Sequence, residues 1–223
     1  DKHFAEDPLR VFRVAQFAGR LQCEVDPELQ TLCQTLSMTT GFENLPKERV
    51  LIELEKGWFK SVHPEVATKW MVELKSLPRY LPTFDTLSAE QWQRTYDRIQ
   101  HASSLRPTLS KGHSMGLFWA MLTFELSETD RLLIFDHLSI ERFHGFPIRK
   151  AFEQLDSLVS LATDQSSHIV QNHIGEHVRP HFIYDVAECA TLGKSTHVTD
   201  NRASSADRGL LDTPLPRLVS GND

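Results

Sequence analysis

The sequence predicts an all-α protein, an irregular array of helices that ends in a disordered C-terminal tail. Two observations carry this prediction. Apolar residues recur at helical spacing through most of the chain, and no segment shows a convincing strand pattern. Proline and Ser/Asp capping residues stand where one such segment gives way to the next, as they do at helix starts. The chain has 223 residues, 40% of them hydrophobic, which is enough for a substantial core.

Four helices are expected in the first third of the chain, each introduced by a proline. The dipeptide Asp7-Pro8 is typical of an N-cap followed by the first helical residue, and it predicts a helix that runs to residue 21. Asp26-Pro27 repeats the signal for a second helix. Prolines at positions 46 and 64 open a third and a fourth, and the prolines of the segment LPRYLPTF interrupt the fourth.

The clearest helix start in the rest of the chain is Ser88. Together with Gln91 it has the spacing of a capping box, and it predicts a helix to residue 102. Periodicity ends after Gly193. We therefore expect residues 194–223, which are rich in small polar side chains, to form a mostly disordered tail. Between these points, further helices are expected over residues 113–126, 128–138, 147–162, 167–177 and 181–192.

Charge and cysteine usage narrow the class of protein. The net charge of -6 argues against a globally basic nucleic-acid-binding protein, although it allows a local basic face. Three cysteines without CxxC spacing favour a reduced, cytoplasmic protein over a secreted disulfide framework. No apolar run approaches the length of a membrane span, and no signal peptide is visible, so we expect no membrane partner.

Two short segments carry a more specific signal. The first, HFAEDPLRVFRVAQFAGRL, contains Glu6, Asp7 and Arg10 in the pattern Glu-Asp-x-x-Arg at a helix start. The second, LPKERVLIELEK, follows about forty residues later. The continuation of the first segment supplies Arg13, Phe17, Ala18 and Arg20, and the second segment supplies Glu48, Arg49, Glu53 and Lys56.

These segments resemble motifs D and E of the class II tRNA nucleotidyltransferases, the family of CCA-adding enzymes and bacterial poly(A) polymerases. The resemblance implies a neck-like region over residues 1–62, a helical body and tail over residues 63–193, and no counterpart for residues 194–223. Phe12 and Gln16 depart from the family's usual leucine and arginine, and Gly19 replaces an alanine.

The resemblance also implies the reaction and the cofactor. A CCA-adding enzyme extends the tRNA 3′ end with CTP and ATP, using Mg²⁺ held by carboxylates of a catalytic head domain. In the family that head lies N-terminal to motif D, and nothing in this chain replaces it. We therefore expect a fragment, which begins at Asp1 rather than Met, that holds no catalytic residue or metal ligand and adds no nucleotide alone. Its partners would be tRNA, CTP, ATP and the missing head domain.

The resemblance assigns nucleotide binding to Asp7, Arg10 and Arg13, with Glu6, Glu48 and Arg49 in supporting roles. Chemistry makes the first two assignments sensible. Cytosine and adenine both present an amino donor beside a ring-nitrogen acceptor, whereas uracil and guanine present a carbonyl beside a ring N–H. A carboxylate accepts and a guanidinium donates, so an Asp/Arg pair complements C and A alone. Taken by itself, however, Asp7 is an ordinary helix cap, and Arg13 is either a phosphate contact or a solvated charge.

Several other patterns favour structural interpretations. His173 and His177 lie four residues apart near His168 and His181, but no carboxylate or cysteine completes a familiar zinc site. Asp136-His137 reverses the order of a His-Asp phosphohydrolase motif, and the other metal ligands of such a motif are missing. The four tryptophans lie on amphipathic helices and are expected in the core rather than as base-stacking platforms. They are Trp58, Trp70, Trp92 and Trp119.

Two alternative functions stay open from the sequence. Bacterial poly(A) polymerases share motif D, although the segments GRLQCEVDPELQTL and VHPEVATKWMVEL resemble the CCA-adding type more closely. A noncatalytic helical module that binds RNA or protein is the alternative from a different class.

Overall fold

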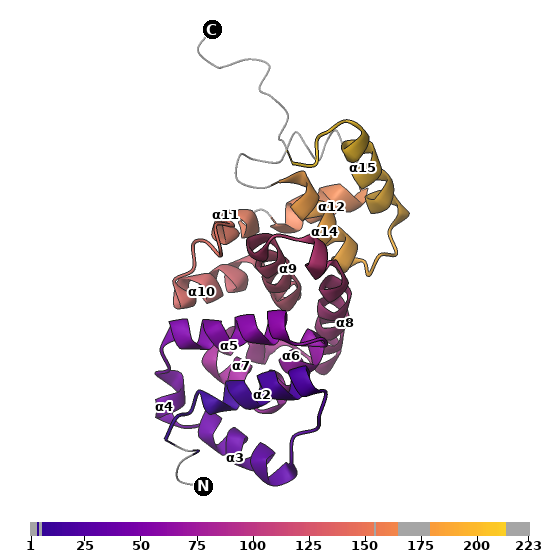
Figure 1. Ribbon diagram of the computed structural model, residues 1–223. Coiled ribbons are helices and arrows are strands. Elements are labelled where there is room, and N and C mark those ends of the chain that lie inside the picture. The colour runs from indigo at the N-terminus through magenta and orange to yellow at the C-terminus, as the bar shows by residue number, and fades with distance from the viewer. Residues whose placement is uncertain (1–3, 5, 154, 165–178, 213–223) are drawn as a thin grey trace. The chain divides into compact units, whose positions relative to one another are not determined.

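The computed structural model describes residues 4, 6–153, 155–164 and 179–212, and in these residues it confirms the all-α prediction (Figure 1). Among them, extended pairing is limited to one isolated bridge between Phe143 and Phe146. The chain divides into two compact units, which are described separately. Unit 1 comprises residues 1–109 and 122–139, and unit 2 comprises residues 110–121 and 140–223.

Unit 1 contains the helices of the two motif segments and those that support them. They are α2 (Arg10–Leu21), α3 (Pro27–Ser37), α4 (Thr40–Glu43), α5 (Lys47–Lys60), α6 (Pro64–Glu73), α7 (Ser76–Tyr80), α8 (Ala89–Leu105) and α10 (Glu128–Leu138), with 3-10 turns at Pro82–Thr86 and Arg106–Thr108. The capping box predicted at Ser88 is confirmed. The Ser88 hydroxyl accepts from the Gln91 N–H at 3.2 Å, and the Gln91 side chain accepts from the Ser88 N–H at 2.9 Å.

The start predicted for the first helix is two residues too early. Helix α2 begins at Arg10, with Leu9 rather than Asp7 as its N-cap. The chain enters α2 through a tight turn, in which the Arg10 N–H donates to the Asp7 carbonyl at 3.0 Å and the Val11 N–H to the Pro8 carbonyl at 3.1 Å. These bonds span three residues, as in a 3-10 helix, and the four-residue bonds of an α-helix start only at the Leu9 carbonyl.

Helix α2 packs against α5 and α6, and its contact with α6 is unusually close. A Cβ atom at Gly19 would lie 2.5 Å from the Ala67 Cβ and 2.7 Å from the Ala67 backbone nitrogen. Since the nearest atoms include backbone, neither helix can yield by turning a side chain. The glycine that departs from the family's alanine is therefore required by the backbone approach of α2 and α6.

An aromatic cluster closes the core beneath α2. The Phe12 ring stacks on Phe42 at 5.6 Å between centroids and meets Tyr80 edge-on at 6.1 Å. The Tyr80 hydroxyl donates to the Leu45 carbonyl at 2.9 Å, which satisfies its polar end. Phe12, another departure from the family pattern, is fully buried and so serves core packing. All four tryptophans are buried, as predicted.

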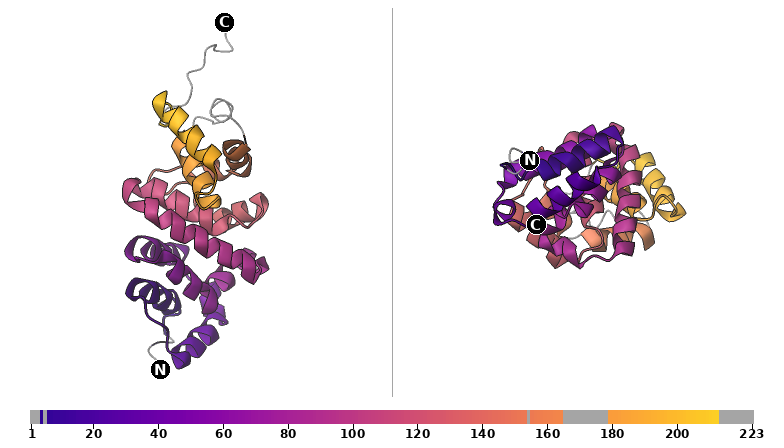
Figure 2. Two further views of the ribbon diagram at one scale, coloured as in Figure 1. Left: turned by 90° about the vertical axis from the view of Figure 1, so that its right-hand side faces the viewer. Right: turned by 90° about the horizontal axis from the view of Figure 1, so that it is seen from below.

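Unit 2 contains most of α9 (Lys111–Thr123), together with α11 (Ile148–Phe152), α12 (Leu155–Asp164), α14 (Pro180–Ala190) and α15 (Thr196–Asp207). Helices α12, α14 and α15 pack on one another, and α15 lies beside α14 in both views (Figures 1 and 2). The single helix predicted over residues 147–162 is two helices in the structure, α11 and α12. The helix predicted over residues 167–177 lies outside the described residues.

The prediction that residues 194–223 are disordered is wrong for α15. The Ser195 hydroxyl caps this helix by accepting from the Val198 N–H at 3.3 Å, and Val198, Asn201 and Ser205 are buried on one face. The Asn201 side chain donates to the Ala162 carbonyl at 3.3 Å. Two of these three inward residues are polar, so the helix has no hydrophobic period to detect in the sequence. Residues 213–223 lie outside the described part.

In the described part of the chain, none of the helices combines the length and the hydropathy that a membrane crossing requires.

Candidate functional site

The two motif segments meet at an ion pair. Arg49, in the first turn of α5, places its Nη2 2.9 Å from Oδ2 of Asp7, in the turn before α2. The other oxygen of Asp7 accepts from the Leu9 N–H at 3.3 Å. The Asp7 side chain is 27% exposed and that of Arg49 49% exposed, so solvent reaches the pair. Motif E therefore holds the carboxylate of motif D in place from the neighbouring helix.

Asp26 provides a comparison inside the same unit, because it begins α3 with the same Asp-Pro dipeptide. Its carboxylate accepts from the Glu28 N–H at 2.9 Å and the Leu29 N–H at 3.3 Å, which is an ordinary N-cap. Among the described residues, Asp7 makes one local bond instead of two and turns its second oxygen toward Arg49. The two dipeptides look alike in sequence but hold their carboxylates in different ways.

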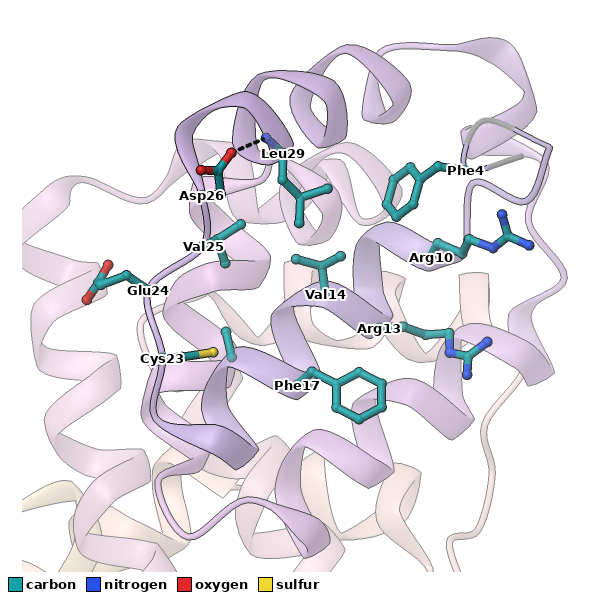
Figure 3. Close-up of a pocket in the computed structure, with 11 residues that line it drawn as sticks. Phe4, Arg10, Arg13, Val14, Phe17, Cys23, Glu24, Val25, Asp26 and Leu29 are labelled. Atoms are coloured by element: carbon teal, nitrogen blue, oxygen red, sulfur yellow. Dashed lines mark hydrogen bonds between the residues drawn. The ribbon is translucent and has the colours of Figure 1, made fainter. Parts of the chain in front are cut away.

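A pocket of about 550 Å³ lies along α2 and the start of α3, and Arg10 and Arg13 line it. Their side chains project from the same side of α2, as expected for residues three apart, and Phe4 lies beside Arg10 (Figure 3). Phe17, one turn beyond Arg13, is 43% exposed and also lines the pocket. The pocket thus offers two guanidinium groups beside two aromatic rings and an apolar floor that includes Val14.

The predicted site residues are only partly brought together. Asp7 lies at the turn before α2, against α5, whereas Arg10 and Arg13 line the pocket. Glu6 is exposed at the same turn. Glu48 is exposed on α5 and lines a different, open pocket at the start of that helix.

Two other residues of motif E make a contact within α5. Glu53 is buried and pairs with Lys56 at 2.7 Å between the carboxylate and the ammonium group. This pair joins residues three apart on one helix, so its role is structural.

No role for Phe4 or Phe17 follows from the sequence. Phe17 belongs to the motif D continuation, and its exposure is what distinguishes it, because a large aromatic side chain on an amphipathic helix is expected to be buried. The sequence offers no comparable signal for Phe4, since its position depends on how the chain approaches α2.

The histidines do not form a metal site in the described residues. Histidines 168, 173 and 177 lie outside these residues. His181 is described, and it lies in unit 2, where its ring pairs with His113. No group of three His, Cys, Asp or Glu side chains in the described part could hold a metal ion.

Comparisons with known proteins find similarity to CCA proteins and to a tRNA nucleotidyltransferase. The CCA-adding enzyme of Actinobacillus succinogenes is 35% identical over 105 residues, which cover 46% of this chain and 26% of that protein. A multifunctional CCA protein of an Azoarcus species is 29% identical over 164 residues, covering 70% and 40%. A tRNA nucleotidyltransferase of Schizosaccharomyces pombe is 34% identical over 130 residues, covering 58% and 25%.

The chain thus spans a quarter to two-fifths of the length of these relatives. No family model matches it, and no solved structure does. The resemblance to CCA-adding enzymes that the two motifs predicted is confirmed by these relatives.

Proposed function

We propose, on the premise that this chain resembles the CCA-adding enzymes, that it is the part of a tRNA nucleotidyltransferase that selects the base and holds the tRNA. The observation that carries the proposal is the pairing of the motif segments at Asp7 and Arg49, beside a pocket lined by Arg10 and Arg13. The proposal also includes a neck-like region over residues 1–62 and a helical body and tail over residues 63–193. It further includes a cytoplasmic location.

Asp7 keeps the capacity to read a base while Arg49 holds it. An ionised carboxylate offers about four lone-pair sites. Arg49 uses one on Oδ2, and the Leu9 N–H uses one on Oδ1. A base amino group can take a remaining site, while the planar guanidinium of Arg10, three residues on, donates to the ring nitrogen. Arg13, one turn further along α2, is placed for a phosphate of the nucleotide or the tRNA.

A wrong base would fail in this arrangement for a physical reason. Uracil and guanine would turn a carbonyl toward Asp7 and a ring N–H toward Arg10, which sets acceptor against acceptor and donor against donor. Sites that leave polar groups unpaired in this way can discriminate by about 10⁴–10⁵.

The direct experiment compares the full-length gene product with the isolated chain. Each is incubated with CTP, ATP, Mg²⁺ and a tRNA that lacks its 3′ CCA, and extension is followed on a sequencing gel. We expect CCA addition by the full-length gene product and none by the isolated chain, because in the family that the chain resembles the carboxylates that hold Mg²⁺ lie in the head domain. Extension by the isolated chain would contradict the assignment of nucleotide transfer to the head domain.

The same assay separates the alternatives. A full-length gene product that incorporates ATP but not CTP would be a poly(A) polymerase, and one that binds tRNA without extending it would be a noncatalytic module. The relatives named above include a CCA-adding enzyme and a multifunctional CCA protein, which favours CCA addition.

Arg49 is expected to act as a positioning residue. We predict that Arg49→Gln lowers the selectivity of the full-length gene product for CTP over UTP by up to about fivefold, since an exposed ion pair is worth at most ~1 kcal/mol. Stability should change by no more than that amount. The measurement is the ratio of kcat/KM for the two nucleotides, together with a urea denaturation curve.

Two further variants decide whether Arg49 acts through its charge. Arg49→Lys keeps a cation near Asp7 and should restore part of the selectivity. Lys60→Gln removes an exposed cation from the other end of α5 and should leave selectivity unchanged. Equal selectivity in the wild type and Arg49→Gln would show that the ion pair has only a structural role.

A further inference from the structure

A second pocket, in unit 2, has a different character from the first. It has a volume of about 410 Å³ and lies between the start of α9 and the loop before α11. Two arginines, Arg142 and Arg179, and three histidines, His113, His144 and His181, line it. No acidic side chain lines the described part of this pocket. The two guanidinium groups of this pocket fit an anion.

The loop that forms one wall is held in a fixed shape. Phe143 and Phe146 exchange backbone hydrogen bonds in both directions at 2.8 Å, and Gly145 between them adopts φ +85°, which glycine tolerates without strain. The Arg142 side chain donates one N–H to the Gly145 carbonyl at 3.1 Å. Arg142 is therefore restrained at the pocket while its other N–H groups can serve a ligand.

The N-terminus of α9 forms the opposite wall. A Cβ atom at Gly112 would lie 2.8 Å from the carbonyl oxygens of both Phe143 and His144, so only glycine allows the loop to approach the helix this closely. Ser110 lines the pocket at the start of the helix, where its hydroxyl accepts from the His113 N–H at 3.2 Å. The positive end of the helix dipole adds to the attraction for an anion.

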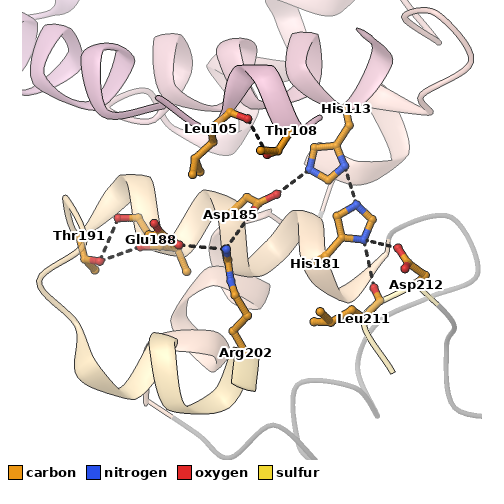
Figure 4. A network of polar contacts seen from close by, with 11 residues as sticks. Leu105, Thr108, His113, His181, Asp185, Glu188, Thr191, Arg202, Leu211 and Asp212 are labelled. Atoms are coloured by element: carbon orange, nitrogen blue, oxygen red, sulfur yellow. Dashed lines mark hydrogen bonds and ion pairs between the residues drawn. The ribbon is translucent and has the colours of Figure 1, made fainter. Parts of the chain in front are cut away.

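The third wall is a chain of hydrogen bonds (Figure 4). His113 Nε2 lies 3.0 Å from Asp185 Oδ2, and His113 Nδ1 lies 2.7 Å from His181 Nε2. His181 Nδ1 in turn lies 3.1 Å from the Leu211 carbonyl. Asp185 is held from its other oxygen by Arg202 at 2.6 Å.

The Asp185 carboxylate and the Leu211 carbonyl are acceptors, so each faces an N–H of the neighbouring imidazole ring. Burial, and then the neighbouring His113, lower the pKa of His181.

All four ring nitrogens of His113 and His181 are engaged in these hydrogen bonds. The two rings therefore line the pocket but do not contact the ligand through their nitrogens. Asp185 does not line the pocket, and His113 and Arg202 both pair with its carboxylate. The direct donors for a ligand are Arg142 and Arg179, both exposed side chains, with Ser110 at the helix start.

We propose that this pocket in unit 2 binds a phosphate group, with Arg142 and Arg179 as its charged donors. Guanidinium groups suit phosphate because their planar fork donates two parallel hydrogen bonds. The phosphate comes either from an RNA backbone or from a free phosphate ion. We expect the RNA backbone, a choice that rests on the proposed function, because arginines at the surface of a polar pocket can be reached by a polymer.

The first arm of the test uses RNA. Binding of a tRNA lacking its 3′ CCA to the full-length gene product is measured by fluorescence anisotropy at a series of salt concentrations. The double variant Arg142→Gln/Arg179→Gln should bind about tenfold more weakly, and its slope of log K against log salt should fall by about 0.7–0.9, the value for one phosphate contact. Arg208→Gln, an exposed arginine of the same unit that does not line the pocket, should leave the slope unchanged.

The second arm uses inorganic phosphate, followed by amide NMR signals of Gly112 and Gly145. We expect both signals to shift with phosphate in the wild type and not in the double variant. Shifts with an unchanged RNA slope would support the pocket and assign it to a free phosphate ion. The absence of shifts at any phosphate concentration would overturn the proposal, even if RNA binding weakened, because the arginines would then act outside the pocket.

These outcomes are independent of the base-reading site in unit 1. A double variant that keeps normal CTP selectivity while its slope of log K against log salt falls supports the phosphate pocket and leaves the proposed function standing. If the wild type added no nucleotides but phosphate still shifted Gly112 and Gly145, the proposed function would fail and the pocket would stand.

Discussion

Asp7→Asn and Arg10→Gln, each made in the full-length gene product, are expected to lower kcat/KM for CTP and ATP by about 10- to 100-fold, the worth of one hydrogen bond to a charged group. The selectivity against UTP and GTP should fall at the same time. Asn keeps the shape of Asp7 but adds two N–H donors, so it can meet the carbonyl that uracil or guanine presents. The measurement is the kcat/KM of each nucleotide with a tRNA ready for the next addition.

The control for these variants is Glu90→Gln, which removes an exposed charge from the first turn of α8 in the same unit. It should change neither rate nor selectivity. If Asp7→Asn slowed all four nucleotides by one common factor, Asp7 would support the fold of the turn and not read the base.

Gly19→Val is expected to destabilise the protein by about 2–3 kcal/mol, within the usual range for overpacking a core. Its new side chain would meet the backbone of Ala67, which cannot turn aside, so α2 and α6 would have to separate. Some of this loss is offset because valine is a better helix former than glycine. The free energy of unfolding from urea denaturation measures the effect, and we expect a melting temperature lower by roughly 5–10 °C.

Gly41→Ala is the matched control in the same unit. A Cβ atom there would lie 3.9 Å from its nearest neighbours, Pro8 and Thr39, and alanine favours a helix more than glycine does. This variant should be as stable as the wild type or slightly more stable. A Gly19→Val protein of wild-type stability would mean that the two helices are not packed as closely as described.

The parts of the fold that the sequence predicted are those determined locally. Ser88 with Gln91 and Asp26 with Pro27 begin helices through contacts within a few residues, and each begins its helix where expected. Predictions from local sequence patterns failed where a contact between residues far apart in sequence determines the structure. Asp7 turns its second oxygen to Arg49, 42 residues away, and α2 begins later than the dipeptide indicates. Helix α15 is held by buried polar residues that no hydrophobic pattern reveals.

The roles of the candidate site residues stay predictions. The motif resemblance named Asp7, Arg10, Arg13 and Arg49, but their arrangement around one turn and one pocket depends on how α2 packs against α5. The pocket in unit 2 could not be predicted. Its wall joins His113 to Asp185, which lie 72 residues apart in sequence, and neither residue belongs to a recognisable motif.

The measurement that tests base reading most directly is a structure of the full-length gene product with CTP and a tRNA that awaits cytidine. We predict that a carboxylate oxygen of Asp7 accepts from the amino group of the cytosine ring, that Arg10 donates to its ring nitrogen, and that Arg49 still holds Asp7. A cytosine bound elsewhere, with Asp7 and Arg10 turned away from its edge, would contradict base selection by this chain.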